Sequence, residues 1–344
     1  MPFVSSVRGT LGLIKRPYPI SDGKGSAAST GGTITTSGAY RIHRFTSVGN
    51  STFTFSVAEN IGGNGSSRSD GTPNTGAVSG AVVEYLVIGG GGGGGVWVGG
   101  GGGAGGYRTG YAVATAGSNT ITVGGGGKGA YNPGSYGGLP GGNSAANGGD
   151  SSAFGLTSAG GGRGGSWTAD TSYVTGTAGG NHGGSGGGGS SCCPAGPGNY
   201  PNTTPPQGNK GASTVAGNGL TSNSYTFGGY NEGGGGGAGA AATNHFGGAG
   251  LYNSITGTSV GYAGGGGAGS HDANSNGSPG SNQSINNGAS DFGGSHGYST
   301  NSSTTPPVLG NERGGGGGGG GNSGGSASIG GAGGSGVVIV RYTV

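Results

Sequence analysis

Runs of glycine constrain the fold of this chain more than any other feature of its sequence. Glycine makes up 103 of the 344 residues and is concentrated in runs such as 89–95 and 314–321. Such a run has no side chains with which to form the apolar face of an amphipathic α-helix. Collagen is also excluded, because its glycine recurs strictly at every third residue among many prolines, whereas this chain has continuous runs and only 14 Pro.

The glycine runs can be interpreted in two ways. Gly-rich segments usually serve as flexible linkers between domains. Here, however, the runs recur many times across residues 89–336, and the chain then returns to a final apolar strand. The ordered alternative is a bundle of polyglycine-II helices, in which each N–H and C=O points outward to a neighbouring helix. Only glycine lets backbones approach closely on several sides, so we expect this bundle over residues 89–336.

Apolar segments on either side of the glycine-rich region predict the strands that anchor such a bundle. Residues 81–88 and 337–344 are almost continuously apolar, as expected of interior strands, and both border Gly-rich sequence. We therefore expect both strands in one sheet, with a further strand at 119–123. The predicted fold class is all-β and irregular: a small antiparallel β base or sandwich carries an inserted polyglycine-II helix bundle, with almost no α-helix.

The first 80 residues have a different character. Residues 1–30 contain Pro2, Pro17 and Pro19 and predict an extended arm. Three segments then have the composition or the alternation of strands, and a turn at 47–50 predicts that the second and third form a hairpin; they span 33–36, 40–46 and 51–57. We divide the chain into an N-terminal arm and β-strand attachment region, residues 1–80, and a glycine-rich domain, residues 81–344.

The charge of the chain excludes several classes of partner. The formal net charge is +3, and no group of Lys and Arg is denser than Lys15-Arg16. Nucleic acids and anionic membranes attract basic patches, so neither is an expected partner. The longest apolar stretch, 337–340, is too short to cross a bilayer, and the N-terminus lacks the pattern of a secretory signal. We expect a soluble protein without membrane insertion.

Side chains that carry chemistry are few and scattered. Ile88 is followed by seven Gly, but neither a helix pattern nor the Lys-Ser/Thr pair of a phosphate-binding loop follows. No pair stands out among the ten acids, and the five histidines are far apart in the sequence; they are His43, His182, His245, His271 and His296. We therefore expect no enzymatic activity, no metal site and no cofactor.

The only two cysteines, Cys192 and Cys193, are adjacent. This spacing suits neither a framework of disulfides between distant segments nor a CxxC metal or redox motif. A vicinal disulfide that stiffens its loop and a pair of free thiols both remain open.

Several stretches of the sequence carry a resemblance to a known family. The glycine-rich region begins with VVEYLVIGGGGGGG, continues with GGGGGAGGYRTG, NTITVGGGG and YAGGGGAG, and finishes with GGSGVVIVRY close to the last residue. This pattern resembles the glycine-rich domain proteins of tailed phages, marine ones especially. It is similar to the tail-fibre adhesins of T-even-like phages, whose tips are polyglycine-II bundles with variable loops, and to glycine-rich domains of some animal receptor kinases. The resemblance implies a receptor-binding protein of the virion.

The expected function is that of a non-enzymatic virion structural protein, a tail-fibre or tail-tip adhesin for host attachment. The resemblance implies that it is made in the host cytoplasm and assembled on the particle, with residues 1–80 docking on other virion proteins and the loops binding a host-surface glycan or an outer-membrane protein. Homo-oligomerisation stays open. The alternative is a capsid decoration or fibre-shaft subunit without receptor binding, and an ice-binding role ranks third.

The receptor-binding end follows from counting passes of the chain. If 89–95 runs outward from the β base and 99–106 returns, continued alternation places four segments at the far end, namely 130–140, 166–178, 240–246 and 270–312. The same count places 150–158, 190–227 and 251–260 near the base. Aromatic side chains offer amphipathic contact surfaces. The candidate receptor-binding residues are the aromatic ones at the far end: Trp97, Tyr131, Tyr136, Trp167, Tyr173, Phe246, Phe292 and Tyr298.

Overall fold

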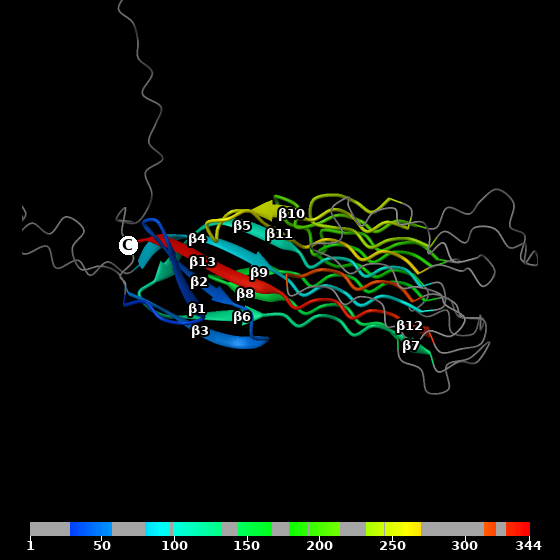
Figure 1. The fold of residues 1–344 in the computed structure, drawn as a ribbon, viewed down its shortest axis with the longest axis horizontal. Helices are drawn as coiled ribbons and strands as arrows, with labels where there is room; N and C mark the ends of the chain where they lie inside the picture. The colour runs from blue at the N-terminus through cyan, green and yellow to red at the C-terminus, as the bar shows by residue number, and fades with distance from the viewer. Residues whose placement is uncertain are drawn as a thin grey trace, which may run out of the picture.

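The computed structural model describes residues 28–56, 80–96, 99–132, 144–166, 179–190, 193–213, 232–243, 245–269, 313–320 and 328–344. All regular elements in these ranges are β-strands, and no helix is present among them. Figure 1 shows a β-sandwich at one end of the molecule, from which many extended passes of the chain run side by side to the other end. The all-β fold class is therefore confirmed.

The first sheet of the sandwich contains the two strands that border the glycine-rich region. Its five strands are antiparallel in the order β1 (Thr33–Ser37), β2 (Tyr40–Phe45), β13 (Val337–Thr343), β4 (Gly80–Ile88) and β5 (Tyr107–Thr115). β4 and β13 are direct neighbours, with Val337 opposite Ile88. The prediction that both lie in one sheet is confirmed, and their apolar composition follows from burial on both faces of that sheet.

The second sheet closes the sandwich and encloses its main core. Its four strands follow the order β3 (Gly49–Phe55), β6 (Gly117–Val123), β8 (Ser151–Ala153) and β9 (Leu156–Ser158). Phe53 and Phe55 of β3 are fully buried, and they pack against Val83, Val338 and Tyr342 of the first sheet. Burial of these large side chains is the main stabilising contribution to the β base.

The hairpin predicted around residues 47–50 is wrong. β2 pairs with β1 and β13, whereas β3 pairs with β6, so the two strands lie in opposite sheets. Gly49 lies where the chain crosses between the sheets. Its φ of 105° is a backbone conformation that favours glycine. The physical reason is burial: strands in facing sheets can pack Phe45 against Phe53, whose ring centroids are 6.3 Å apart.

The described part of the N-terminal region belongs to this same sandwich. β2 is hydrogen-bonded to β13 from the end of the chain, and β3 is hydrogen-bonded to β6 from the glycine-rich region. The described strands β1 to β3 are therefore part of the same sandwich as β4, β6 and β13.

Two small ladders complete the fold. β10 (Leu251–Asn253) and β11 (Val260–Tyr262) form a hairpin, and Ile255 and Tyr262 from this segment cover Leu86 and Ile339 on the outer face of the first sheet. At the other end of the molecule, β7 (Tyr131–Asn132) pairs with β12 (Ser328–Ile329).

The glycine runs form a polyglycine-II bundle, as the hydrogen bonds of residues 89–95 show. Gly89, Gly92 and Gly95 donate to the 99–106 run at 2.9–3.0 Å. Gly90 and Gly93 donate to the 144–150 run, and Gly91 and Gly94 donate to the 328–336 run. The partner therefore repeats at every third residue, the period of a helix with about three residues per turn.

The carbonyl groups of residues 89–95 face three further runs. They accept hydrogen bonds from the 124–130, 159–166 and 313–320 runs, so this helix has six neighbours in all. A Cβ added to any of these seven glycines would lie 1.8–2.2 Å from a backbone oxygen of a neighbour. Close approach on all sides thus explains why the run contains no other residue, and the predicted bundle is confirmed.

The direction of the passes agrees with the sequence count in some places and corrects it in others. Gly89 is hydrogen-bonded to Gly106 near the sandwich, and Gly95 is hydrogen-bonded to Gly100 at the far end. This pairing confirms that 89–95 runs outward and that 99–106 returns. Residues 150–158 and 251–260 lie at the sandwich as predicted, because the first range contains β8 and β9 and the second contains β10 and Ile255, which packs on the first sheet.

The predicted location of 190–227 near the base is wrong for its first residues. The single return pass expected over 179–189 is in fact two passes. The first pass returns toward the sandwich beside the 159–166 run, where the Asn181 N–H donates to the Arg163 carbonyl. The chain then reverses. The Gly184 N–H donates to the Gly160 carbonyl near the sandwich, and the Gly165 N–H donates to the Gly188 carbonyl toward the far end. The bridge between Ser190 and Cys193 therefore lies at the far end.

Candidate functional site

The far end of the bundle brings together residues that flank the two tryptophans. The backbone N–H of Val96 donates to the hydroxyl oxygen of Ser166 at 3.1 Å. The buried side chain of Val96 packs against Ala130 and Ala145. Trp97 and Trp167 follow Val96 and Ser166 in the sequence and lie outside the described residues, so their common location stays a prediction.

Two of the candidate aromatic residues are described, and the structure does not bring them together. Tyr131 of β7 is opposite Ile329 and is 39% exposed, while Phe246 is 40% exposed and contacts the ring of His245. The 124–130 run before Tyr131 borders the 89–95 run, whereas the backbone of Phe246 lies against Gly234. The 89–95 and 99–106 runs separate these locations. The other candidates lie outside the described residues: Trp97, Tyr136, Trp167, Tyr173, Phe292 and Tyr298.

A second surface lies at residues 199–207, away from the aromatic candidates of the far end, and its segment Asn199-Tyr200-Pro201-Asn202 has the aromatic and hydrogen-bonding composition expected of a receptor contact. Asn199 has a φ of 54°, and its side-chain oxygen accepts hydrogen bonds from the Thr203 N–H at 3.1 Å, the Thr203 hydroxyl at 2.9 Å and the Gln207 N–H at 3.1 Å. One side chain thus holds both ends of the loop. The sequence signal for this ordered loop is the repeated Asn, Thr and Pro of NYPNTTPPQ, a composition typical of turns that side chains close through hydrogen bonds.

Gln207 joins this loop to the bundle. Its side chain is 1% exposed, and its two amide atoms have different partners: Oε1 accepts from the Ala159 N–H at 2.9 Å, and Nε2 donates to the Pro201 carbonyl at 2.8 Å. Next to this buried amide the loop displays Tyr200, 53% exposed, whose ring centroid is 4.1 Å from that of His182. The loop is therefore ordered while its aromatic ring faces solvent.

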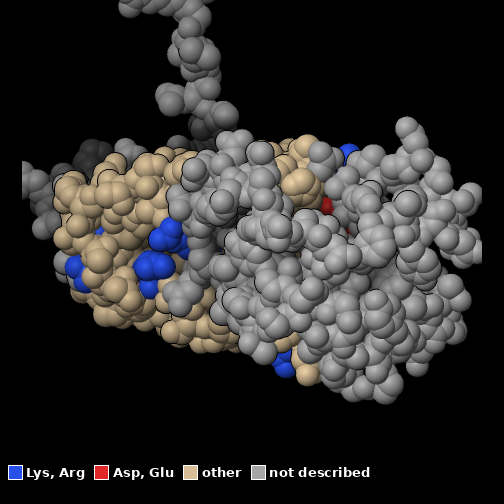
Figure 2. Space-filling model, turned by 45° about the vertical axis from the view of Figure 1, so that its right-hand side comes forward, with Lys and Arg blue, Asp and Glu red and all other residues tan. Residues whose placement is uncertain are grey.

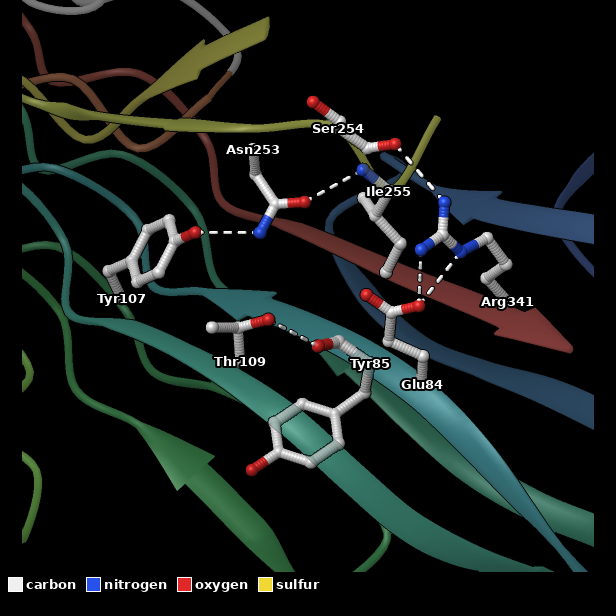
Figure 3. A network of polar contacts seen from close by, with 8 residues as sticks. All are labelled: Glu84, Tyr85, Tyr107, Thr109, Asn253, Ser254, Ile255 and Arg341. Atoms are coloured by element: carbon white, nitrogen blue, oxygen red, sulfur yellow. Dashed lines mark hydrogen bonds and ion pairs between the residues drawn. The ribbon is translucent and has the colours of Figure 1, made fainter. Parts of the chain in front are cut away.

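The strongest ionic contact of the described residues fastens the β10–β11 hairpin to the sandwich (Figure 3). Arg341 of β13 donates to Glu84 of β4 through Nε at 2.8 Å and Nη2 at 2.5 Å, and its Nη1 reaches the Ser254 carbonyl at 3.2 Å. Asn253 donates to the Tyr107 hydroxyl at 2.8 Å. Every one of these groups has a structural partner, so the network tethers the hairpin to the sandwich.

His43 is a buried titratable group in the sandwich. Its Nδ1 lies 2.7 Å from the Gly31 carbonyl and its Nε2 lies 3.0 Å from the Tyr342 hydroxyl. Since a carbonyl can only accept, Nδ1 carries the proton and Nε2 accepts from Tyr342. Burial lowers the pKa of His43, and the nearby charge of Arg41 lowers it further. The arrangement stabilises a neutral imidazole.

Other features of the described residues bear on the chemical expectations. The N–H groups of Gly89–Gly95 all donate to backbone carbonyls, so they do not form a phosphate-binding loop after Ile88. Among the described residues no three His, Cys, Asp or Glu side chains lie close enough to hold a metal ion. Cys193 is disulfide-bonded, and Cys192 lies outside the described residues.

The surface adds two observations. On the face seen in Figure 2, Lys and Arg gather mainly over the sandwich, and most of the described surface is uncharged. A groove of about 470 Å³ is lined by residues 195–197, 210–213 and 242–243, and Lys210 is its only charged lining residue. In the described part of the chain no helix is long and apolar enough to span a membrane.

Comparison with known proteins identifies the family. The model of the glycine-rich domain family matches residues 77–343, most of the chain. The chain therefore belongs to the glycine-rich domain family. No curated protein matches it.

Proposed function

We propose that this protein is a structural component of a tailed-phage virion and acts as a tail-fibre or tail-tip adhesin. Segments at the far end of its bundle bind a receptor on the host surface, a glycan or an outer-membrane protein. The N-terminal region docks on other virion proteins at the opposite end. The proposal needs no catalysis and no cofactor.

The observation that carries this proposal is the shared location of the ends of the outward passes. Gly94 binds Ala130, Gly95 binds Gly320 and Gly99 binds Gly269, so these ends lie at one level, remote from the sandwich. The sequence that continues from them is no longer glycine alone but is rich in Asn, Ser, Thr and aromatic residues, for example at 167–178 and 270–312. A rigid bundle that carries many such segments at one end suits the display of contacts to a receptor.

The sandwich end suits attachment for a complementary reason. β5 is an edge strand of the described sheet, and its Tyr111 and Val113 are 75% and 48% exposed. Exposed apolar residues on a sheet edge favour contact with another protein. The first residues described, from Ala28, enter the fold at the sandwich through the bridge between Thr30 and Thr54.

The test uses the full chain and the particles that carry it. Purified protein should bind host cells saturably and should reduce adsorption of the phage, and gold-labelled antibody should mark the tail in electron micrographs. Label spread over the capsid lattice, or protein that neither binds cells nor competes with the phage, would refute the adhesin. The first of these results would favour a capsid decoration instead.

A further inference from the structure

We infer that Tyr200 and His182 form a binding platform for a neutral saccharide on the flank of the molecule, separate from the far end of the bundle. The inference rests on the proposed adhesin function, since it names the chemical class of a ligand on the host surface. It also adds a site at residues 199–207, which the proposed function leaves unused.

The first argument is the exposure of an aromatic pair. Tyr200 is 53% exposed and His182 is also exposed, although their ring centroids are only 4.1 Å apart at an interplanar angle of 64°. His182 thus supports one side of the tyrosine ring and leaves other parts of it to solvent. An exposed ring of this kind offers an apolar face with a polar hydroxyl at its edge, which suits the C–H face and the hydroxyl groups of a sugar ring.

The second argument is the order of the loop. The Tyr200 N–H donates to the Gly183 carbonyl at 3.0 Å, and the Asn199 N–H donates to the Gly184 carbonyl at 2.8 Å. The loop is thereby fixed to the 183–190 run beside His182. Asn199 and the buried Gln207 close it from within. A ligand that binds a preformed surface does not have to order it, and this reduces the entropic cost of binding.

The third argument concerns charge. Residues 183–209 contain no Asp, Glu, Lys or Arg. The other exposed polar side chains of the loop are neutral, among them Asn202 and Thr204, whose amide and hydroxyl can exchange hydrogen bonds with sugar hydroxyls. An acidic saccharide would find no cation on this loop, so the chemistry favours a neutral pyranose.

The experiment measures binding of defined sugars to the full chain by saturation-transfer NMR. The probes are methyl α-glucopyranoside, methyl α-mannopyranoside, methyl β-galactopyranoside, dextran and mannan, with sialyllactose as an anionic comparison. The variants are Tyr200→Ala, Tyr200→Phe and His182→Ala, and the control is Tyr252→Ala, which removes a tyrosine that is 63% exposed on β10. Thermal unfolding of each variant establishes that it is folded.

At least one neutral probe should bind the unaltered protein, and Tyr200→Ala should weaken that binding by about tenfold or more. Tyr200→Phe keeps the ring and should retain most of the affinity, as should Tyr252→Ala. The inference is overturned if no neutral probe binds, if sialyllactose binds more tightly than all of them, or if folded Tyr200→Ala binds as the unaltered protein does.

The same variants separate this inference from the adhesin proposal. Host cells that bind the unaltered protein and Tyr200→Ala equally well would overturn the saccharide site as a receptor contact and leave the adhesin intact. Sugar binding that depends on Tyr200, in a protein that does not bind host cells, would support the saccharide site and overturn the adhesin proposal.

Discussion

Replacing Gly93 by Ala tests the packing of the polyglycine bundle at one interior position. The added Cβ would lie 2.0 Å from the carbonyl oxygen of Lys128 and 2.5 Å from its carbonyl carbon. Since real Cβ atoms do not come within 3.0 Å of such atoms, the 89–95 and 124–130 runs must separate by at least about 1 Å.

The separation determines the magnitude of the effect. The two runs are joined by hydrogen bonds from Gly127 N–H to Gly91 at 2.8 Å and from Ala130 N–H to Gly94 at 3.0 Å. An added ångström takes both beyond hydrogen-bonding range, at roughly 1 to 3 kcal/mol for each buried group left unpaired. Alanine also lowers the conformational entropy of the unfolded chain, which stabilises the folded protein by about 0.4 to 1 kcal/mol. We expect a net loss of about 2 to 5 kcal/mol in the free energy of unfolding.

Gly125→Ala is the matched control in a neighbouring run. A Cβ at this position meets only Val48 Cγ1, at 3.4 Å, and Gly125 has no left-handed φ. We expect its free energy of unfolding to stay within about 1 kcal/mol of the unaltered protein, with a bias toward stabilisation. Urea unfolding followed by tyrosine and tryptophan fluorescence measures both variants. Equal stability of Gly93→Ala and Gly125→Ala would refute the reasoning.

Three further predictions concern the sandwich and the loop. Glu84→Gln removes the carboxylate bound by Arg341, so the free energy of unfolding should fall by about 1 kcal/mol, and hydrogen exchange at Leu251–Tyr262 should accelerate more than exchange at β3. Burial lowers the pKa of His43, so below the ordinary value near 6.5 the unfolded chain binds a proton more readily than the folded one. The free energy of unfolding should therefore fall as pH drops from about 7.5 to 5.5. His43→Leu should reduce this dependence of stability on pH. An unchanged slope would exclude His43 as its source. Gln207→Leu leaves the Ala159 N–H without its side-chain partner, and a loss of roughly 1 to 3 kcal/mol with faster exchange at residues 199–206 is expected; slow exchange there would contradict the role of Gln207 in ordering the loop.

The parts of the fold that could be predicted from the sequence are those with a local signal. β4 and β13 are long and nearly continuously apolar, and their pairing follows because both border the glycine-rich insertion. The bundle could be predicted because runs without side chains have few ordered alternatives. β5 was missed: its sequence YRTGYAVAT contains Gly110, which weakens the strand signal, and its pairing with β4 comes from the reversal of the chain between the 89–95 and 99–106 runs.

The parts that could not be predicted depend on long-range contacts. Nothing local indicates that the chain between β2 and β3 crosses from one sheet to the other, because that choice is determined by which faces bury Phe45 and Phe53. The reversal between Asn181 and Gly184 was missed because every residue of a glycine run resembles its neighbours, so a run contains no signal for its own ends. The order of the 199–207 loop depends on Gln207 reaching Ala159, a contact across 48 positions of sequence.

Hydrogen exchange of the glycine amides tests the central claim, an ordered bundle in which each interior run has neighbours on all sides. Electron-transfer fragmentation can resolve the exchange of single residues in 89–95 and 99–106. Because Gly89–Gly95 all donate to backbone carbonyls at 2.8–3.0 Å and are buried, their amides should exchange as slowly as those of β4 and β13. Exchange of these glycines at the rate of an unstructured peptide would contradict the bundle and show that the runs are linkers.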